Sequence, residues 1–136
     1  MFVVQTKATL HMNYLAILVA GIVNMVLGYV YYLPSLFGTK WANFVGMDAS
    51  RMGKIPWYEI IIGVGLTFIQ AFAVAWLIRQ LNISDIATAM KTMLIVWLGF
   101  TVVTSLSWFT FSKNTDMFLI NNLYYLISFS VMFIIL

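Results

Sequence analysis

The chain has 136 residues, of which 63 % are hydrophobic and 8 % are charged. Soluble domains carry about 25 % charged residues and avoid large exposed apolar patches, so this composition excludes a soluble fold. The net charge of +3 comes from basic and acidic residues that are scattered along the chain, which excludes a nucleic-acid-binding stripe. The sequence contains no cysteine, which excludes disulfides, thiolate metal sites and catalytic thiols.

The fold class follows from stretches that contain no formally charged residue. They cover residues 8–39, 60–78, 92–112 and 117–136. Each is long enough to cross a hydrocarbon layer about 30 Å thick as a helix, which satisfies its own backbone hydrogen bonds there. We therefore expect an all-α integral membrane protein, with one domain over residues 1–136. It is an up-down bundle of four transmembrane helices, near 13–33, 57–81, 85–111 and 117–136.

The first helix and the segment after it have recognisable boundaries. Asn13 can cap the helix start, and Pro34 ends it because the residue before a proline is driven out of the α region. Beyond this point Trp41, Phe44 and Val45 fall on one helical face. We expect a short helix lying in the membrane interface between the first and second transmembrane helices.

The remaining boundaries come from polar residues between the uncharged stretches. Ser84 or Asp85 can cap the third helix. The short polar segment 113–116 predicts a tight turn, so we expect the third and fourth helices to be antiparallel neighbours.

Four crossings place both termini on the same side of the membrane. The basic residues on that side are Lys7, Arg79 and Lys91; those on the other side are Lys40, Arg51, Lys54 and Lys113. Since basic residues favour the cytoplasmic side, we expect a multi-pass protein of the cell membrane with both termini outside. Met12 stands beside Met1 as a second candidate for the native start.

Small residues recur at every fourth position in two of the helices. The first helix carries Ala20, Asn24 and Gly28, and the second carries Gly63, Thr67, Ala71 and Ala75. Helices in a bilayer associate through close contact at such small residues. We expect these two seams to face each other; the alternative is that one packs against a second copy or another protein.

Uncharged polar side chains occur near the middle of the helices. They are Asn24, Gln70, Thr104, Ser105, Asn121 and Tyr125. They can line a polar pocket or pathway, or they can hydrogen-bond between helices; we favour the second, because unpartnered amides are costly in hydrocarbon. We interpret the aromatic residues toward one boundary as an interfacial belt rather than a ligand cage. They are Tyr31, Tyr32, Trp41, Trp57, Tyr58, Trp108, Phe109 and Phe111.

Several stretches carry a resemblance to a known family. They are MNYLAILVAG at 12–21, LPSLFGTKW at 33–41, WLGF at 97–100, and FLIN at 118–121 with Tyr124. Together they resemble the prokaryotic four-helix membrane family known as domain of unknown function 1761, over about residues 12–136. The resemblance implies the fold and no activity. Family members often carry a histidine where this chain has Tyr125, and this departure weakens any expectation of a metal or proton site there.

Function is predicted mainly by exclusion. Apart from His11, which precedes the first helix, the uncharged stretches contain no Asp, Glu, Lys, Arg or His, which disfavours a proton-coupled transporter. Glu59 lies at the start of the second helix, where a boundary role is expected. His11 has no clustered acid or cysteine, so we expect no enzyme, no cofactor and no metal.

We expect a small non-catalytic structural or accessory subunit that contacts membrane lipid and no nucleic acid. It would pack as a homo-oligomer or within a larger membrane complex. The alternative is an uncoupled small-solute transporter or channel that uses the polar interior of the bundle.

Overall fold

The computed structural model describes residues 12–47 and 55–136. Met1, Lys7, His11, Arg51 and Lys54, on which part of the sequence argument rests, lie outside the described residues. Every regular element in the described part is a helix. In order they are α1 (Tyr14–Tyr31), η1 (Pro34–Gly38), α2 (Thr39–Phe44), α3 (Trp57–Gln80), α4 (Ile86–Val96), η3 (Trp97–Val102), α5 (Val103–Ser112) and α6 (Thr115–Ile135).

The described chain contains four helices that are long and apolar enough to cross a membrane. They are α1, α3, the continuous helix Ile86–Ser112 formed by α4, η3 and α5, and α6. The predicted fold class, an all-α integral membrane protein with four transmembrane helices, is therefore confirmed. The starts of α1 and α3 and the ends of all four lie within a few residues of the predicted boundaries.

Side-chain caps fix the starts of three helices. Asn13, Asp85 and Asn114 each accept a hydrogen bond from the backbone N–H three residues later, at 3.0, 2.8 and 3.0 Å. Each bond satisfies a helix N–H that has no partner within the helix. The predicted caps at Asn13 and Asp85 are confirmed. Helix α6 begins at Thr115 rather than at the predicted 117, because Asn114 supplies the cap.

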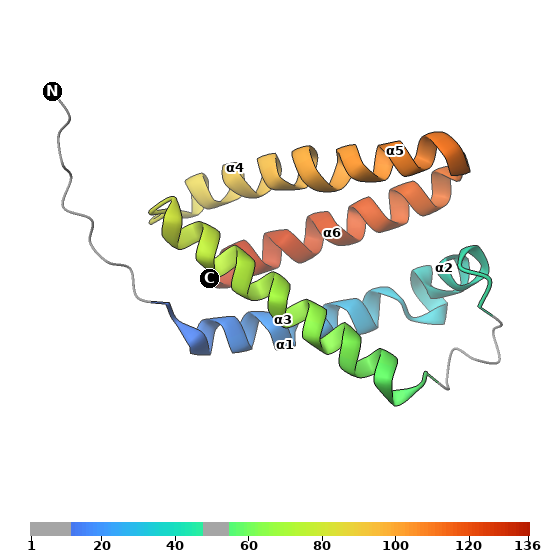
Figure 1. The fold of residues 1–136 in the computed structure, drawn as a ribbon, viewed down its shortest axis with the longest axis horizontal. Coiled ribbons are helices and arrows are strands. Elements are labelled where there is room, and N and C mark those ends of the chain that lie inside the picture. Colours follow the sequence, from blue (N-terminus) through green and yellow to red (C-terminus); the bar gives the residue numbers. More distant parts are fainter. Residues whose placement is uncertain (1–11, 48–54) are drawn as a thin grey trace, which may run out of the picture.

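Helices α1 and α6 form the centre of the molecule. α1 contacts α3 on one side and α6 on the other, and α6 also contacts α4, α5 and α2. Figure 1 shows α4 and α5 running alongside α6, whereas α3 crosses α1 obliquely and its first half points away from α5. A buried apolar cluster that includes Ile17, Ala71 and Met132 joins the helices at this crossing.

The turn after α1 brings α2 back onto the bundle. Leu36 leaves helical geometry, with φ −109° and ψ −108°. A Cβ on Gly38 would lie 2.1 Å from the backbone oxygen of Tyr32, so only glycine fits this close approach. Phe37 stacks on Tyr31, with ring centroids 4.6 Å apart. The LPSLFG stretch is therefore a compact turn that determines where α2 lies.

The short helix expected between the first two transmembrane helices is α2, and it contacts α6. Trp41 packs on Tyr32 with ring centroids 5.5 Å apart, and Phe44 packs on Trp108 at 5.8 Å. Val45, which was expected on the same face, is exposed. Val45 caps the end of the helix, and its backbone N–H still bonds to the Trp41 carbonyl at 3.0 Å; the aromatic contacts reach Trp41 and Phe44 and leave Val45 uncovered.

The first described residues and the end of the chain lie together. Met12, Asn13 and Leu136 line one small cavity with residues from the end of α3. The start of α1 and the end of α6 are thus at the same end of the bundle, as Figure 1 also shows.

Candidate functional site

A buried polar pair joins α1 to α6. The Ser128 hydroxyl donates a hydrogen bond to Asn24 Oδ1 at 2.6 Å, and these side chains are 0 % and 1 % exposed. Farther along the same contact, the Tyr31 hydroxyl donates to the carbonyl of Ile120 at 2.8 Å. In a low-dielectric interior such bonds favour one register between two helices. Asn24 therefore belongs to the α1–α6 contact.

The two small-residue seams meet over only part of their length. Ala20 and Ala71 are fully buried in one cluster, and a Cβ on Gly21 would lie 2.4 Å from the Phe68 ring. Gly28, however, faces α6, because a Cβ there would lie 3.0 Å from the Tyr124 hydroxyl. The expectation that the whole seams face each other was wrong for Asn24 and Gly28. Two straight helices that cross obliquely touch over a few turns only.

The first half of the α3 seam is unpaired within the described chain. Gly63 is exposed, and a Cβ built on it would have no atom from another described element within 4 Å. Thr67 is half-buried and donates to the carbonyl of Gly63 at 3.0 Å, within its own helix. Ala75, farther along, is partly buried against the central cluster. The seam therefore changes from exposed to buried along α3.

A second polar group joins α5 to α6. Asn122 Nδ2 donates to the Ser105 hydroxyl and to the carbonyl of Phe118, both at 2.8 Å. The indole N–H of Trp97 donates to the backbone carbonyl of Asn122 at 2.9 Å. Asn122 is buried, whereas the sequence pattern predicted a role for its neighbour Asn121 and none for Asn122. Only the position of α5 shows which of the two adjacent amides bonds to Ser105.

The third transmembrane helix contains a π-helical turn, η3, next to this polar group. Wider turns of this kind displace backbone carbonyls from their usual N–H partners and are frequent at functional sites. Here the hydroxyls of Thr104 and Ser105 lie within hydrogen-bonding distance of the carbonyls of Phe100 and Val102. The side chains after the turn thus hydrogen-bond to its backbone.

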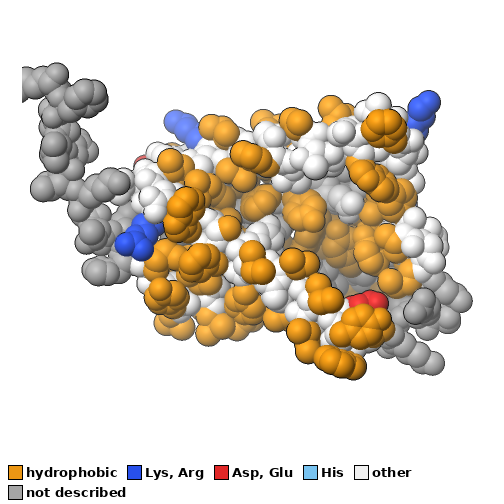
Figure 2. Space-filling view, in the orientation of Figure 1, with side chains coloured by type: hydrophobic (Ala, Val, Ile, Leu, Met, Phe, Trp, Pro, Cys, Tyr) orange, Lys and Arg blue, Asp and Glu red, His pale blue; other side chains and the backbone are white. Residues whose placement is uncertain are grey.

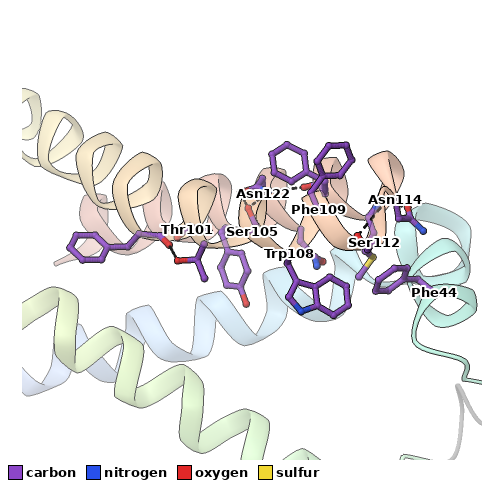
Figure 3. A pocket seen from close by; sticks show the side chains of 14 residues that line it. Phe44, Thr101, Ser105, Trp108, Phe109, Ser112, Asn114 and Asn122 are labelled. Carbon is purple, nitrogen blue, oxygen red and sulfur yellow. Dashed lines mark hydrogen bonds between the residues drawn. The ribbon is translucent and has the colours of Figure 1, made fainter.

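A groove of about 370 Å³ lies between α5 and α6 and reaches Phe44 of α2 at one end (Figure 3). Its aromatic walls are Phe44, Phe100, Trp108, Phe109, Phe118 and Tyr125. Its polar lining consists of Thr101, Thr104, Ser105, Ser112, Asn114, Asn121 and Asn122. The apolar side chain of Met117 also lines the groove. None of the described residues that line it carries a formal charge. Figure 2 shows that the surface is hollowed between α5 and α3, and that hydrophobic side chains lie at the bottom of this hollow.

The groove brings together four of the six predicted polar residues: Thr104, Ser105, Asn121 and Tyr125. Asn121 also accepts a 3.4 Å hydrogen bond from the Tyr32 hydroxyl. Asn24 lies instead in the α1–α6 contact, and Gln70 is half-buried on α3, outside the groove. No buried side-chain nitrogen or oxygen in the described residues lacks a hydrogen-bond partner.

The aromatic residues assigned to an interfacial belt have different surroundings. Tyr31 and Tyr32 both pack on Tyr124, with ring centroids 5.3 and 5.2 Å apart. Trp108 lines the groove, whereas Trp57 is exposed at the start of α3. Part of this aromatic set therefore packs inside the molecule.

A second, more polar cavity of about 290 Å³ adjoins the groove. It is lined by Lys40, Asn43, Phe44, Asn114, Asp116, Met117 and Ile120, and it shares Phe44, Asn114 and Met117 with the groove. Lys40 Nζ and Asp116 Oδ2 form an exposed ion pair at 3.3 Å. The combined lining changes from a charged pair near the helix ends to aromatic rings farther along.

The groove offers hydroxyl and amide groups as hydrogen-bonding partners. In the part of the chain that the structure describes, no three His, Cys, Asp or Glu residues gather where they could hold a metal ion. Hydroxyls and amides with aromatic walls are suited to binding an uncharged or overall neutral molecule.

The comparisons with known proteins identify a family and name no activity. None of the curated proteins and none of the solved structures matches the chain. A family model described as "Protein of unknown function (DUF1761)" matches residues 15–136. The match covers most of the chain, and this protein therefore belongs to the DUF1761 family of unknown function.

Proposed function

We propose that this protein is a non-catalytic structural or accessory subunit of the membrane, which associates with itself or with a larger membrane complex. The associating surface is the first half of α3. In this proposal the chain lies in the cell membrane with both termini outside.

The observation that carries the proposal is the exposure of α3. All residues from 57 to 63 are exposed, although a helix packed against a bundle normally buries one face. Gly63 and Gly65 leave the backbone open, since no packing atom in the described chain comes within 4 Å of a Cβ on either. Small residues of this kind let a partner helix approach closely in a bilayer. Lipid alone does not require them.

Site-specific photocrosslinking in native membranes tests the proposal. A photoreactive side chain at Gly63 should give adducts of higher mass that contain protein, either a second copy or another subunit. The matched control is Val26, which is exposed on α1 and outside the small-residue seam. Adducts with lipid alone at Gly63, or equal protein adducts at both positions, would contradict the proposal.

A second candidate function is uncoupled passage of a small neutral solute. It is favoured by the uncharged hydroxyls and amides that line the groove between α5 and α6. Solute flux in proteoliposomes should then fall when Ser105 is replaced by leucine, and it should be unchanged by Gln70→Ala. Absence of flux by the wild-type protein for a panel of neutral solutes would exclude this candidate.

A further inference from the structure

The groove and the cavity beside it are adjacent and share part of their lining. The groove has aromatic walls and uncharged polar groups, whereas the adjoining cavity contains Lys40 and Asp116. Phe44, Asn114 and Met117 belong to both. A molecule that fits both parts has an apolar portion and a head that carries both signs of charge.

The dimensions correspond to those of one lipid chain. The groove extends along the third transmembrane helix from Ser112 to Phe100. At about 1.5 Å per residue this is roughly 18 Å, close to the distance of about 15 Å from a membrane boundary to the bilayer centre. The charged pair lies at the helix ends, where headgroups lie, and the apolar part extends toward the membrane interior.

The charges indicate the class of head. Lys40 and Asp116 are 63 % and 69 % exposed, so each can exchange its partner for a ligand group. A phosphate can take the place of the carboxylate beside Lys40, and an ammonium group can take the place of the lysine beside Asp116. A headgroup with a net negative charge would form an ion pair with Lys40 but would be repelled by the carboxylate of Asp116.

We propose that the groove and this cavity together bind one zwitterionic phospholipid that carries a primary amine. Its phosphate lies at Lys40, its amine at Asp116, and one acyl chain lies along α5 and α6 between Trp108 and Phe118. Asn114 and Ser112 lie where the head joins the chain and can donate to its ester oxygens. The inference goes beyond the proposed association, because this site and the first half of α3 are separate surfaces.

Native mass spectrometry of the full chain in mild detergent tests this site. The purified protein is offered ethanolamine, choline and glycerol phospholipids with identical chains. We expect one ethanolamine phospholipid to be retained per chain, about tenfold more strongly than the other two. Equal retention of all three heads would overturn the assignment.

Variants separate the two parts of the site. Trp108→Ala should weaken retention of all three lipids about tenfold. The control is Phe111→Ala, which should leave retention unchanged, because Phe111 is exposed on the same helix and does not line the groove. Asp116→Asn should abolish the preference for ethanolamine over choline, and Lys113→Gln serves as its control in the same turn. Equal losses in Trp108→Ala and Phe111→Ala would show nonspecific lipid contact and refute the proposal.

A photoreactive acyl chain identifies the occupant directly. Crosslinked peptides should come from residues 100–109 and 117–125. Disulfide crosslinking of Thr104→Cys to a second copy would show that protein covers the groove, which would also refute the proposal. Failure of α3 to crosslink would leave this result unaffected, so the two proposals are tested separately.

Discussion

The contact between α1 and α6 and the first half of α3 both contain small and polar residues four positions apart, but these residues have different surroundings. In the first, Asn24 and Ser128 are buried and bonded to each other, and Gly28 makes room for Tyr124. In the second, Thr67 bonds within its own helix, and no described atom outside that helix lies within 4 Å of a Cβ built on Gly63. The same four-residue spacing therefore packs between helices in one place and is exposed among the described residues in the other.

The difference follows from helix direction. Figure 1 shows α1 and α6 side by side over most of their length, whereas α3 crosses α1 and then diverges. Side chains along α1 and α6 meet at several successive levels, from Asn24–Ser128 to Tyr31–Ile120. Along α3 such contacts are concentrated near Ala71 and Val74, which are buried.

The largest effect is expected for Gly38→Ala, in the turn that leads from α1 to α2. The new Cβ would collide with the Tyr32 backbone oxygen, which cannot move away as a side chain can. We expect a loss of about 1–3 kcal/mol in the free energy of unfolding. Denaturation by SDS in mild detergent measures it, and faster amide exchange in α2 should accompany it. Wild-type stability in this variant would show that the turn adapts.

An intermediate effect is expected for Asn24→Ala, which leaves the Ser128 hydroxyl buried without its acceptor. The free energy of unfolding should fall by about 1–2 kcal/mol. In a double-mutant cycle, Ser128→Ala should lower the free energy of unfolding much less in the Asn24→Ala background than it does in the wild-type protein.

The control for this cycle is Thr67→Ala on α3, whose hydroxyl bonds only its own helix among the described residues. It should change the free energy of unfolding by a few tenths of a kcal/mol at most. Additive losses for Asn24 and Ser128, or a similar loss for Thr67, would remove the contrast between the two regions.

No loss of stability is expected for Gly65→Ala, in the exposed half of α3. The new methyl group meets no packing atom of the described chain, and alanine favours a helix more than glycine does. Dispersed in detergent, the variant should be unchanged or more stable by up to about 1 kcal/mol. Thermal unfolding monitored by circular dichroism measures this. A clear destabilisation would mean that α3 packs more closely on its own chain than the structure shows.

The sequence by itself determined that this protein lies in a membrane and that it has four transmembrane helices. Long uncharged stretches leave a helix as the simplest way to satisfy the backbone in hydrocarbon, and caps such as Asn13 and Asp85 are local features that are readable from residue type. Family membership was also predicted from short stretches such as LPSLFG, and the family match confirms it.

The tertiary structure alone decided which helices pair and which face each polar residue takes. Four-residue spacing places Ala20 and Asn24 on one stripe of α1. Because α3 crosses α1 obliquely, Ala20 packs in the cluster that contains Ala71 of α3, whereas Asn24 bonds to Ser128 of α6. The choice of Asn122 over Asn121 as the partner of Ser105 likewise depends on the position of α5. The physical reason is that hydrophobicity changes little around these helices, so their rotation and crossing are determined by contacts between residues distant in sequence.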